Sequence, residues 1–224
     1  MKRIVVLFFM AGLPALAVAQ RTWDTIPNLP DHYRQKMEEF NREPVAKGNV
    51  LFLGNSLTER GNWKKLLRDS SVINRGISGD ITFGVLHRLS DVIRRQPSKV
   101  FLLIGINDLS KGIPDPVIME NLFSIVRKIR VGSPTTKIFV QSILPTNSTF
   151  KNFPPLYDKN DHVVVLNTQF QKYADRLGFV YVDLYSKFLD KNNHLEASYS
   201  VDGLHLNPTG YAHWLEILKS LGCL

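Results

Sequence analysis

Five short apolar runs alternate with amphipathic helical patterns, and this alternation constrains the fold more than any other feature of the sequence. Most of the runs are long enough for a buried strand and rich in β-branched or aromatic residues. Parallel strands need crossover helices between them, and those crossovers are right-handed. The sequence therefore predicts an α/β fold, a three-layer α/β/α sandwich around a five-stranded, mainly parallel sheet. The predicted strands are Val50 to Leu53, Val72 to Asn74, Val100 to Ile104, Ile138 to Ile143 and Phe179 to Val182.

The segments between the runs carry apolar residues at three- and four-residue spacing, which is typical of helices with one buried face. The last helix is predicted to begin at Asn207-Pro208, a cap residue followed by proline in the first turn. The other predicted helices are Pro30 to Lys47, Ile81 to Arg95, Pro116 to Arg130 and His162 to Leu177. Leu144 to Asn160, with three prolines, reads as one long loop, and we expect it to influence specificity.

The size and composition indicate one globular domain, predicted at residues 20–224. The chain has 224 residues, of which 44% are hydrophobic and 21% charged, a balance usual for a globular protein. Its single cysteine, Cys223, excludes an internal disulfide and a thiolate metal cluster held by this chain alone. Since the histidines show no paired ligand spacing either, we expect neither a metal nor an organic cofactor.

The first nineteen residues have the layout of a secretory signal peptide. Lys2 and Arg3 precede the apolar run Ile4 to Ala11, and Ala17-Val18-Ala19 fits a small-residue cleavage site. An uncleaved anchor is the alternative, but the apolar stretch is shorter than the ~20 residues of a spanning helix and contains a proline. We predict signal peptide 1–19, export to the periplasm or outside the cell, and no stable membrane insertion after cleavage.

The formal net charge of +8 does not indicate a nucleic-acid partner. The basic residues occur in short groups, such as Lys64-Lys65 and Arg94-Arg95, within helical patterns whose outer faces are solvated. No motif that interleaves aromatic and basic residues accompanies them. The sequence leaves the oligomeric state open.

Polar residues follow the predicted strands at the points where ligands bind in α/β sheets, outside the carboxyl ends of the strands. A fourth polar set precedes the last helix. The four sets are Gly54-Asn55-Ser56-Leu57, Gly76-Ile77-Ser78-Gly79-Asp80, Gly105-Ile106-Asn107-Asp108 and Asp202-Gly203-Leu204-His205.

These sets can supply hydrogen-bond donors for a developing negative charge. Ser56 would open a helix, which puts its hydroxyl and its backbone N–H at a positive helix terminus. Gly79 has no side chain to keep an oxygen away from its backbone N–H. Asn107 carries two side-chain N–H donors. One donor from each set would make an oxyanion hole with three donors.

The four sets resemble, in order and separation, the sequence blocks of the SGNH (GDSL-like) hydrolase superfamily, and the match runs from about Val50 to Tyr211. The resemblance implies a flavodoxin-like fold and a serine hydrolase mechanism. It implies that Ser56 is the nucleophile, and that Gly79 and Asn107 complete the oxyanion hole with the Ser56 N–H. His205 would then be the general base, oriented by Asp202. An imidazole titrates near neutral pH and so suits the activation of a serine.

Three further side chains in these sets have structural interpretations. Asn55 departs from the family pattern, in which Asp is commoner. Asparagine retains the capping ability that would hold the turn before the helix, but the missing charge beside Ser56 is expected to bear on the pH dependence. Asp80 is predicted to cap the helix that follows it, and Asp108 is predicted to be structural.

The segment Asn74 to Asp80 is similar to the platelet-activating-factor acetylhydrolase-like and sialate acetylesterase-like branch. By this analogy we expect an exported serine esterase that removes acetyl or another short acyl group from a carbohydrate. Its only predicted partner is a small-molecule or glycan ester. Two alternatives stay open. One is a lysophospholipase, thioesterase or arylesterase with a longer acyl site, and the other is a non-catalytic glycan-binding module on the same fold.

Overall fold

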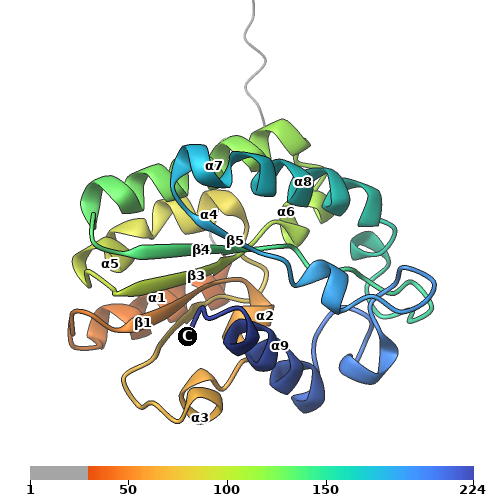
Figure 1. Ribbon diagram of the computed structural model, residues 1–224, viewed down its shortest axis with the longest axis horizontal. Helices are drawn as coiled ribbons and strands as arrows, with labels where there is room; N and C mark the ends of the chain where they lie inside the picture. The colour runs from red at the N-terminus through yellow and green to blue at the C-terminus, as the bar shows by residue number, and fades with distance from the viewer. Residues whose placement is uncertain (1–29) are drawn as a thin grey trace, which may run out of the picture.

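The computed structural model describes residues 30–224. The predicted signal peptide and its cleavage site lie outside these residues. The described chain folds around a five-stranded sheet with strand order β2-β1-β3-β4-β5, and every neighbouring pair is parallel (Figure 1). The predicted α/β class and parallel sheet are confirmed.

The elements follow the predicted order, with ends that shift by a few residues. The strands are β1 (Val50–Gly54), β2 (Ile73–Gly76), β3 (Lys99–Leu103), β4 (Lys137–Gln141) and β5 (Val180–Val182). The helices are α1 (Asp31–Arg42), α2 (Ser56–Glu59), α3 (Trp63–Leu67), α4 (Thr82–His87), α5 (Leu89–Arg94), α6 (Ile106–Ser110), α7 (Asp115–Gly132), α8 (Asn160–Leu177) and α9 (Pro208–Ser220). Single 3₁₀ turns form at Pro154–Leu156, Tyr185–Lys187 and Ala197–Tyr199.

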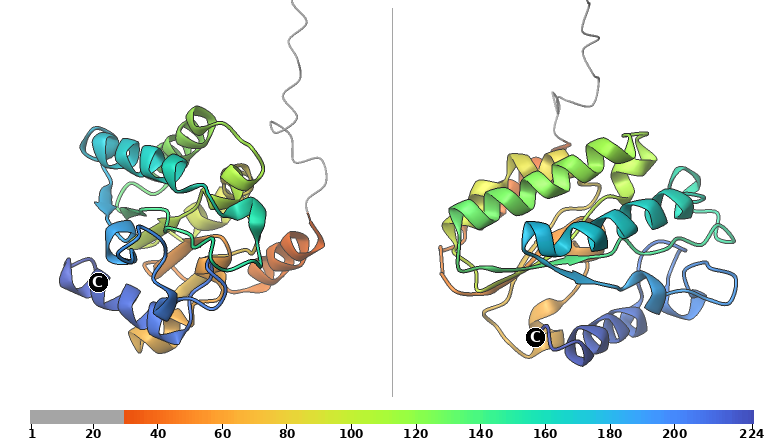
Figure 2. Two further views of the ribbon diagram at one scale, coloured as in Figure 1. Left: turned by 90° about the vertical axis from the view of Figure 1, so that its right-hand side faces the viewer. Right: turned by 45° about the horizontal axis from the view of Figure 1, so that its top comes forward.

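Two hydrophobic layers cover the two faces of the sheet, because successive strand side chains point to opposite sides. On one face, Leu51 and Leu53 pack with residues of α4, α5, α7 and α8. On the other, Phe52 packs with Trp63 of α3 and Trp214 of α9. Figure 2 shows α7 and α8 on one side of the sheet and α9 on the other. The predicted three-layer sandwich is therefore confirmed.

The prediction of a single helix over Ile81 to Arg95 is wrong. The segment forms α4 and α5, separated at Arg88, whose backbone has φ −101° and ψ 10°. The Arg88 side chain turns into the protein, where its Nε donates to the Asp80 carboxylate at 2.9 Å. An arginine side chain that is buried against Asp80 cannot also lie on the solvent-exposed face of a continuous helix.

The start of α9 agrees with its sequence signal, since the Asn207 Oδ1 accepts the Gly210 N–H at 2.9 Å. The predicted loop Leu144 to Asn160 contains one 3₁₀ turn and leads into α8. Within residues 30–224, no helix has the length and apolar character that a membrane crossing needs.

Candidate active site

Ser56 is the first residue of α2, two residues after the end of β1. The preceding residue, Asn55, is fully buried, and its Oδ1 accepts the Leu57 N–H at 3.1 Å. This hydrogen bond satisfies one of the free N–H groups of the first helical turn. The predicted capping role of Asn55 is confirmed, and it fixes where the Ser56 side chain points.

The structure brings Ser56, His205 and Asp202 together from two distant parts of the chain. The His205 Nε2 lies 3.0 Å from the Ser56 Oγ, and its Nδ1 lies 2.7 Å from the Asp202 Oδ2. If Nδ1 donates its proton to the carboxylate, Nε2 presents a lone pair to the serine hydroxyl. In this arrangement His205 can accept the Ser56 proton.

Backbone hydrogen bonds hold the Asp202 carboxylate in place. Its Oδ1 accepts the His205 N–H at 2.7 Å and the Leu204 N–H at 3.1 Å, which leaves Oδ2 for the imidazole. Burial by itself would raise the pKa of Asp202, but the hydrogen bonds from His205 and Leu204 and the nearby imidazole hold it below its usual value. Asp202 is therefore an anion at neutral pH.

The environment of His205 favours the neutral imidazole. Burial lowers its pKa below the ordinary 6.5, and the charge of Arg60 acts in the same direction, whereas the bond to Asp202 opposes them. A histidine must be neutral to accept a proton, so it is ready to act as a base at pH 7.

We expect kcat/KM to fall on the acid side with an apparent pKa below about 6.5, the unperturbed value for histidine. Protonation removes the base, and the lowered pKa of His205 moves that loss to lower pH. The profile would be measured with p-nitrophenyl acetate. An acid limb well above pH 7 would contradict the assigned environment of His205.

The three predicted oxyanion donors lie at the carboxyl ends of three adjacent strands, β1, β2 and β3. Gly79 follows β2 and has φ +79°, a backbone conformation that favours glycine. Asn107 lies on α6, and one of its Nδ2 protons goes to the Asp80 carbonyl at 2.9 Å. That bond places Asn107 against the Gly79 turn and leaves its second N–H available.

Asp80 and Asp108 are both buried, and their carboxylates accept hydrogen bonds from backbone, arginine or hydroxyl groups. The prediction that Asp80 caps the following helix is wrong, because its carboxylate bonds to the Ile81 N–H and to Arg88. Asp108 takes the first free N–H of α4 instead, accepting from the Thr82 N–H at 3.0 Å and from the Thr82 hydroxyl. Its predicted structural role is confirmed, and burial raises its pKa to about 7.

The Arg88 side chain forms hydrogen bonds to several loops of the site. Nothing in the sequence marks it for this role. Its Nη1 donates to the Arg75 carbonyl at 2.9 Å and its Nη2 to the Gly54 carbonyl at 3.0 Å, while Nε bonds to Asp80. It therefore links the ends of β1 and β2 to the Gly79-Asp80 turn. In the sequence Arg88 looks like any arginine on a helix, and only its burial distinguishes it.

The loop Leu144 to Asn160 packs against the segment that carries Asp202 and His205. The Tyr157 hydroxyl donates to the Asp202 carbonyl at 2.6 Å, and the Asn147 N–H donates to the Gly203 carbonyl at 2.8 Å. The Phe153 ring meets the His205 ring edge-on, with centroids 5.5 Å apart. This loop therefore borders the site, as its expected influence on specificity requires.

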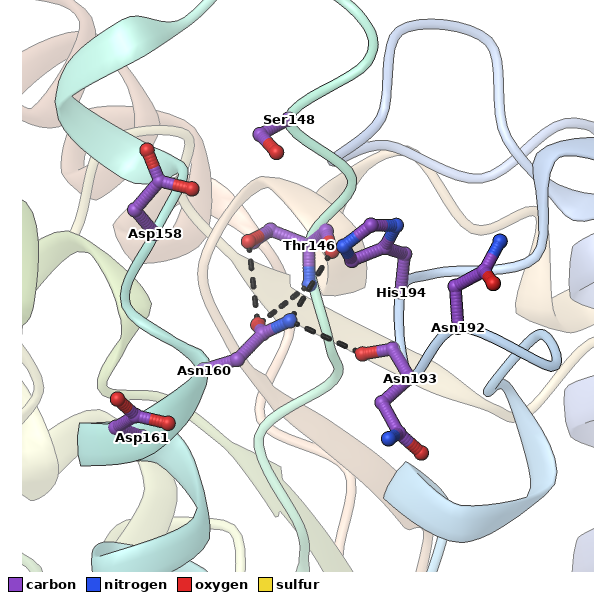
Figure 3. Close-up of a pocket in the computed structure, with 8 residues that line it drawn as sticks. All are labelled: Thr146, Ser148, Asp158, Asn160, Asp161, Asn192, Asn193 and His194. Atoms are coloured by element: carbon purple, nitrogen blue, oxygen red, sulfur yellow. Dashed lines mark hydrogen bonds between the residues drawn. The ribbon is translucent and has the colours of Figure 1, made fainter.

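A polar pocket of about 290 Å³ is lined in part by residues of the same loop (Figure 3). Thr146 and Ser148 line it, and Asn147 between them bonds to Gly203. The pocket is thus one residue away from the Asp202–His205 segment. Its remaining lining side chains are also polar, namely Asp158, Asn160, Asp161, Asn192, Asn193 and His194. Among residues 30–224, no group of three or more histidine, cysteine or acidic side chains is arranged to hold a metal ion.

The sequence matches the GDSL-like lipase/acylhydrolase family model over residues 52–213, which span all four polar sets. The chain belongs to this family. As a GDSL-like acylhydrolase it is a serine ester hydrolase, and the resemblance drawn from its sequence blocks is confirmed.

Named relatives of this GDSL-like acylhydrolase are ester hydrolases. It is 26% identical over 200 residues to platelet-activating factor acetylhydrolase IB subunit alpha2 of Rattus norvegicus, covering 86% of this chain and 82% of the relative. It is 31% identical over 116 residues to an arylesterase of Vibrio mimicus, covering 51% of this chain and 54% of the relative.

Solved structures of similar shape include one from Streptococcus pneumonia whose description refers to platelet activating factor. That structure is 29% identical, with a TM-score of 0.76, and the match covers 85% of this chain and 92% of the other. A GDSL-like lipase from Bacteroides thetaiotaomicron has a TM-score of 0.74 at 24% identity, covering 86% and 98%. The second likeness, at this identity, supports the fold alone.

Proposed function

We propose that this acylhydrolase removes acetyl or another short acyl group from a carbohydrate through an acyl-Ser56 intermediate, and that it is exported. The observation that carries the catalytic part is the 3.0 Å contact between the His205 Nε2 and the Ser56 Oγ, backed by Asp202. A serine hydroxyl is a weak nucleophile until an adjacent base takes its proton.

The reaction proceeds in two halves. His205 takes the Ser56 proton as the oxygen attacks the ester carbonyl, and the N–H groups of Ser56, Gly79 and Asn107 bind the resulting oxyanion. The imidazolium then protonates the leaving sugar oxygen, and the C–O bond of the ester breaks. Water activated by neutral His205 attacks the acyl-Ser56, and Ser56 regains its proton as the carboxylic acid departs.

One observation supports a short acyl group, because the rat relative is named as an acetylhydrolase. The longer-chain alternative predicts the opposite selectivity. With a series of p-nitrophenyl esters, activity should collapse beyond short chains, and a preference for long chains would overturn this part of the proposal.

The polar pocket supports a carbohydrate as the alcohol part of the substrate. All eight of its lining side chains carry hydroxyl, amide, carboxyl or imidazole groups, which can form hydrogen bonds with sugar hydroxyls. Its wall continues into the segment that holds Asp202 and His205. Acetate release from acetylated sugars tests directly whether a sugar bound there presents its ester to Ser56.

We expect Asn192→Ala and Asp158→Asn to raise KM for acetylated oligosaccharides several-fold and to leave hydrolysis of p-nitrophenyl acetate unchanged. Both side chains line the pocket, and p-nitrophenyl acetate has no sugar to reach them. Asparagine at 158 tolerates the local φ of +58°. Lys191→Ala is the matched control, since Lys191 is an exposed neighbour outside the pocket lining. Equal KM values across all variants would remove the pocket from the substrate site.

Export rests on residues 1–19, whose sequence has the three regions of a signal peptide. N-terminal sequencing of protein collected outside the cytoplasm should begin at Gln20. Retention of Met1 would contradict cleavage.

A further inference from the structure

We propose that Glu59 is a positioning residue for the oxyanion hole, holding the turn that carries the Gly79 N–H against the helix that carries the Ser56 N–H. The inference rests on the proposed function, because it concerns the donors assigned there. The two backbone donors come from different segments, α2 and the turn after β2. Their separation therefore depends on a contact between those segments.

Glu59 makes that contact through a single carboxylate oxygen. Its Oε2 accepts the Ser78 N–H at 2.6 Å and the Ser78 hydroxyl at 2.6 Å. Glu59 lies three residues after Ser56 on the same helical turn, and Ser78 directly precedes Gly79. One side chain thus joins the two backbone segments that supply the donors.

Hydrogen bonds, rather than packing at Gly79 itself, hold the Gly79 turn. Gly79 is solvent-exposed with φ +79°, and a Cβ placed there would meet no atom within 4 Å. Glycine also has the widest conformational freedom of any residue. Ser78 is held at both its N–H and its hydroxyl, which limits rotation of the peptide that presents the Gly79 N–H.

Helix α2 packs closely against the end of β2, next to the link between Glu59 and Ser78. A Cβ on Gly76, at the end of β2, would lie 2.1 Å from the Glu59 nitrogen. Only glycine at this position lets α2 come so near to β2. The Glu59 carboxylate then spans the short remaining distance to Ser78.

Helix α1 keeps the Glu59 carboxylate charged and oriented. The His32 Nε2 lies 3.0 Å from both of its oxygens, and the Lys36 Nζ lies 3.9 Å from Oε1. Burial would raise the pKa of Glu59, but hydrogen bonds from Ser78 and His32 hold it below its usual value. A carboxylate accepts stronger hydrogen bonds than a neutral group does, which suits it to this clamp.

We expect Glu59→Ala to lower kcat about 10- to 100-fold with p-nitrophenyl acetate and to leave KM within about twofold of wild type. The hole binds charge that develops only in the transition state, so a displaced donor affects kcat. Losing an oxyanion donor outright costs about 10² to 10³ in kcat, and a displaced donor should cost less. Affinity for a short-chain alkyl boronic acid, whose Ser56 adduct is tetrahedral, should fall in parallel.

Glu59→Gln should restore most of the lost rate, because its amide oxygen can still accept from Ser78. Glu39→Ala is the matched control: Glu39 bonds to Lys36 on the same face of α1 and does not contact Ser78. Its kcat should equal that of wild type. A merely structural role for Glu59 would change the thermal midpoint without separating kcat from KM.

The inference is overturned if folded Glu59→Ala keeps its kcat within about threefold of wild type, or if only KM changes. Should that variant not fold, Ser78→Ala decides, since it removes only the hydroxyl: a fall in kcat at constant KM supports the clamp, and an unchanged kcat refutes it. Ser56→Ala distinguishes a failure of the proposed mechanism from a failure of the Glu59 clamp. Full activity in that variant would remove the proposed mechanism itself, whereas its inactivity beside a normal Glu59→Ala rejects the clamp alone.

Discussion

Replacing Ser56 with alanine is expected to abolish ester hydrolysis, with a loss on the order of 10⁶ in kcat, the scale seen when a triad nucleophile is removed from another serine hydrolase. The exchange deletes one hydroxyl, which is hydrogen-bonded to the His205 Nε2. Without it, no acyl-enzyme can form, and His205 has no proton to take. Hydrolysis of p-nitrophenyl acetate and of acetylated sugars would both be measured.

The fold of this variant should be unchanged, because alanine has a high helix propensity and Asn55, which caps the helix, is not replaced. Thermal unfolding and circular dichroism provide the control. Wild-type activity in Ser56→Ala would refute the nucleophile assignment. A wild-type protein that binds glycans but shows no Ser56-dependent turnover would instead support the non-catalytic glycan-binding module.

Replacing Asp202 with asparagine is expected to lower kcat by roughly 10⁴, as the same exchange does in another serine hydrolase triad. The backbone N–H groups of Leu204 and His205 donate to Oδ1, so the asparagine oxygen would stay there. Its NH₂ group would then face the His205 Nδ1. That nitrogen would become an acceptor, Nε2 would carry the proton, and the imidazole could no longer take the Ser56 proton.

A comparison of two exchanges at Asp202 separates its effect on kcat from its effect on stability. Asp202→Asn keeps the shape and both backbone bonds, so its stability should remain near that of wild type. Asp202→Ala removes those bonds as well and serves as the comparison, with a lower thermal midpoint and a similar loss of kcat. An Asp202→Asn enzyme with kcat within tenfold of wild type would contradict the assigned role.

The fold class was readable from the sequence because burial on both faces gives parallel strands a continuous apolar pattern. The runs at Val50 and Val100 are such strands, and the amphipathic stripes that follow Val100 became α7 and α8. The strand ends shifted by a few residues. The break at Arg88 was not visible, since a helical pattern does not show that an arginine turns inward to an aspartate.

The residues of the candidate site were also identifiable, because strand ends and the four-block resemblance point to Ser56, Gly79, Asn107, Asp202 and His205. The sequence could not show distances, and Ser56 and His205 are 149 positions apart. Their contact follows from where α9 and its preceding loop pack beside α2. The Asn55 cap was predictable because it is a local hydrogen bond between residues two positions apart.

The sequence by itself thus determined the layered α/β architecture, the edge of the sheet where ligands bind, and the residue types available for chemistry there. Each of these depends on local periodicity or on interactions between residues that are close together in the sequence. The tertiary structure decided the partners: Asp80 with Arg88, Asp108 with Thr82, and Glu59 with Ser78. Side chains on separate segments meet only after the chain packs, because hydrogen bonds in a buried site depend on three-dimensional proximity and leave no periodic trace in the sequence.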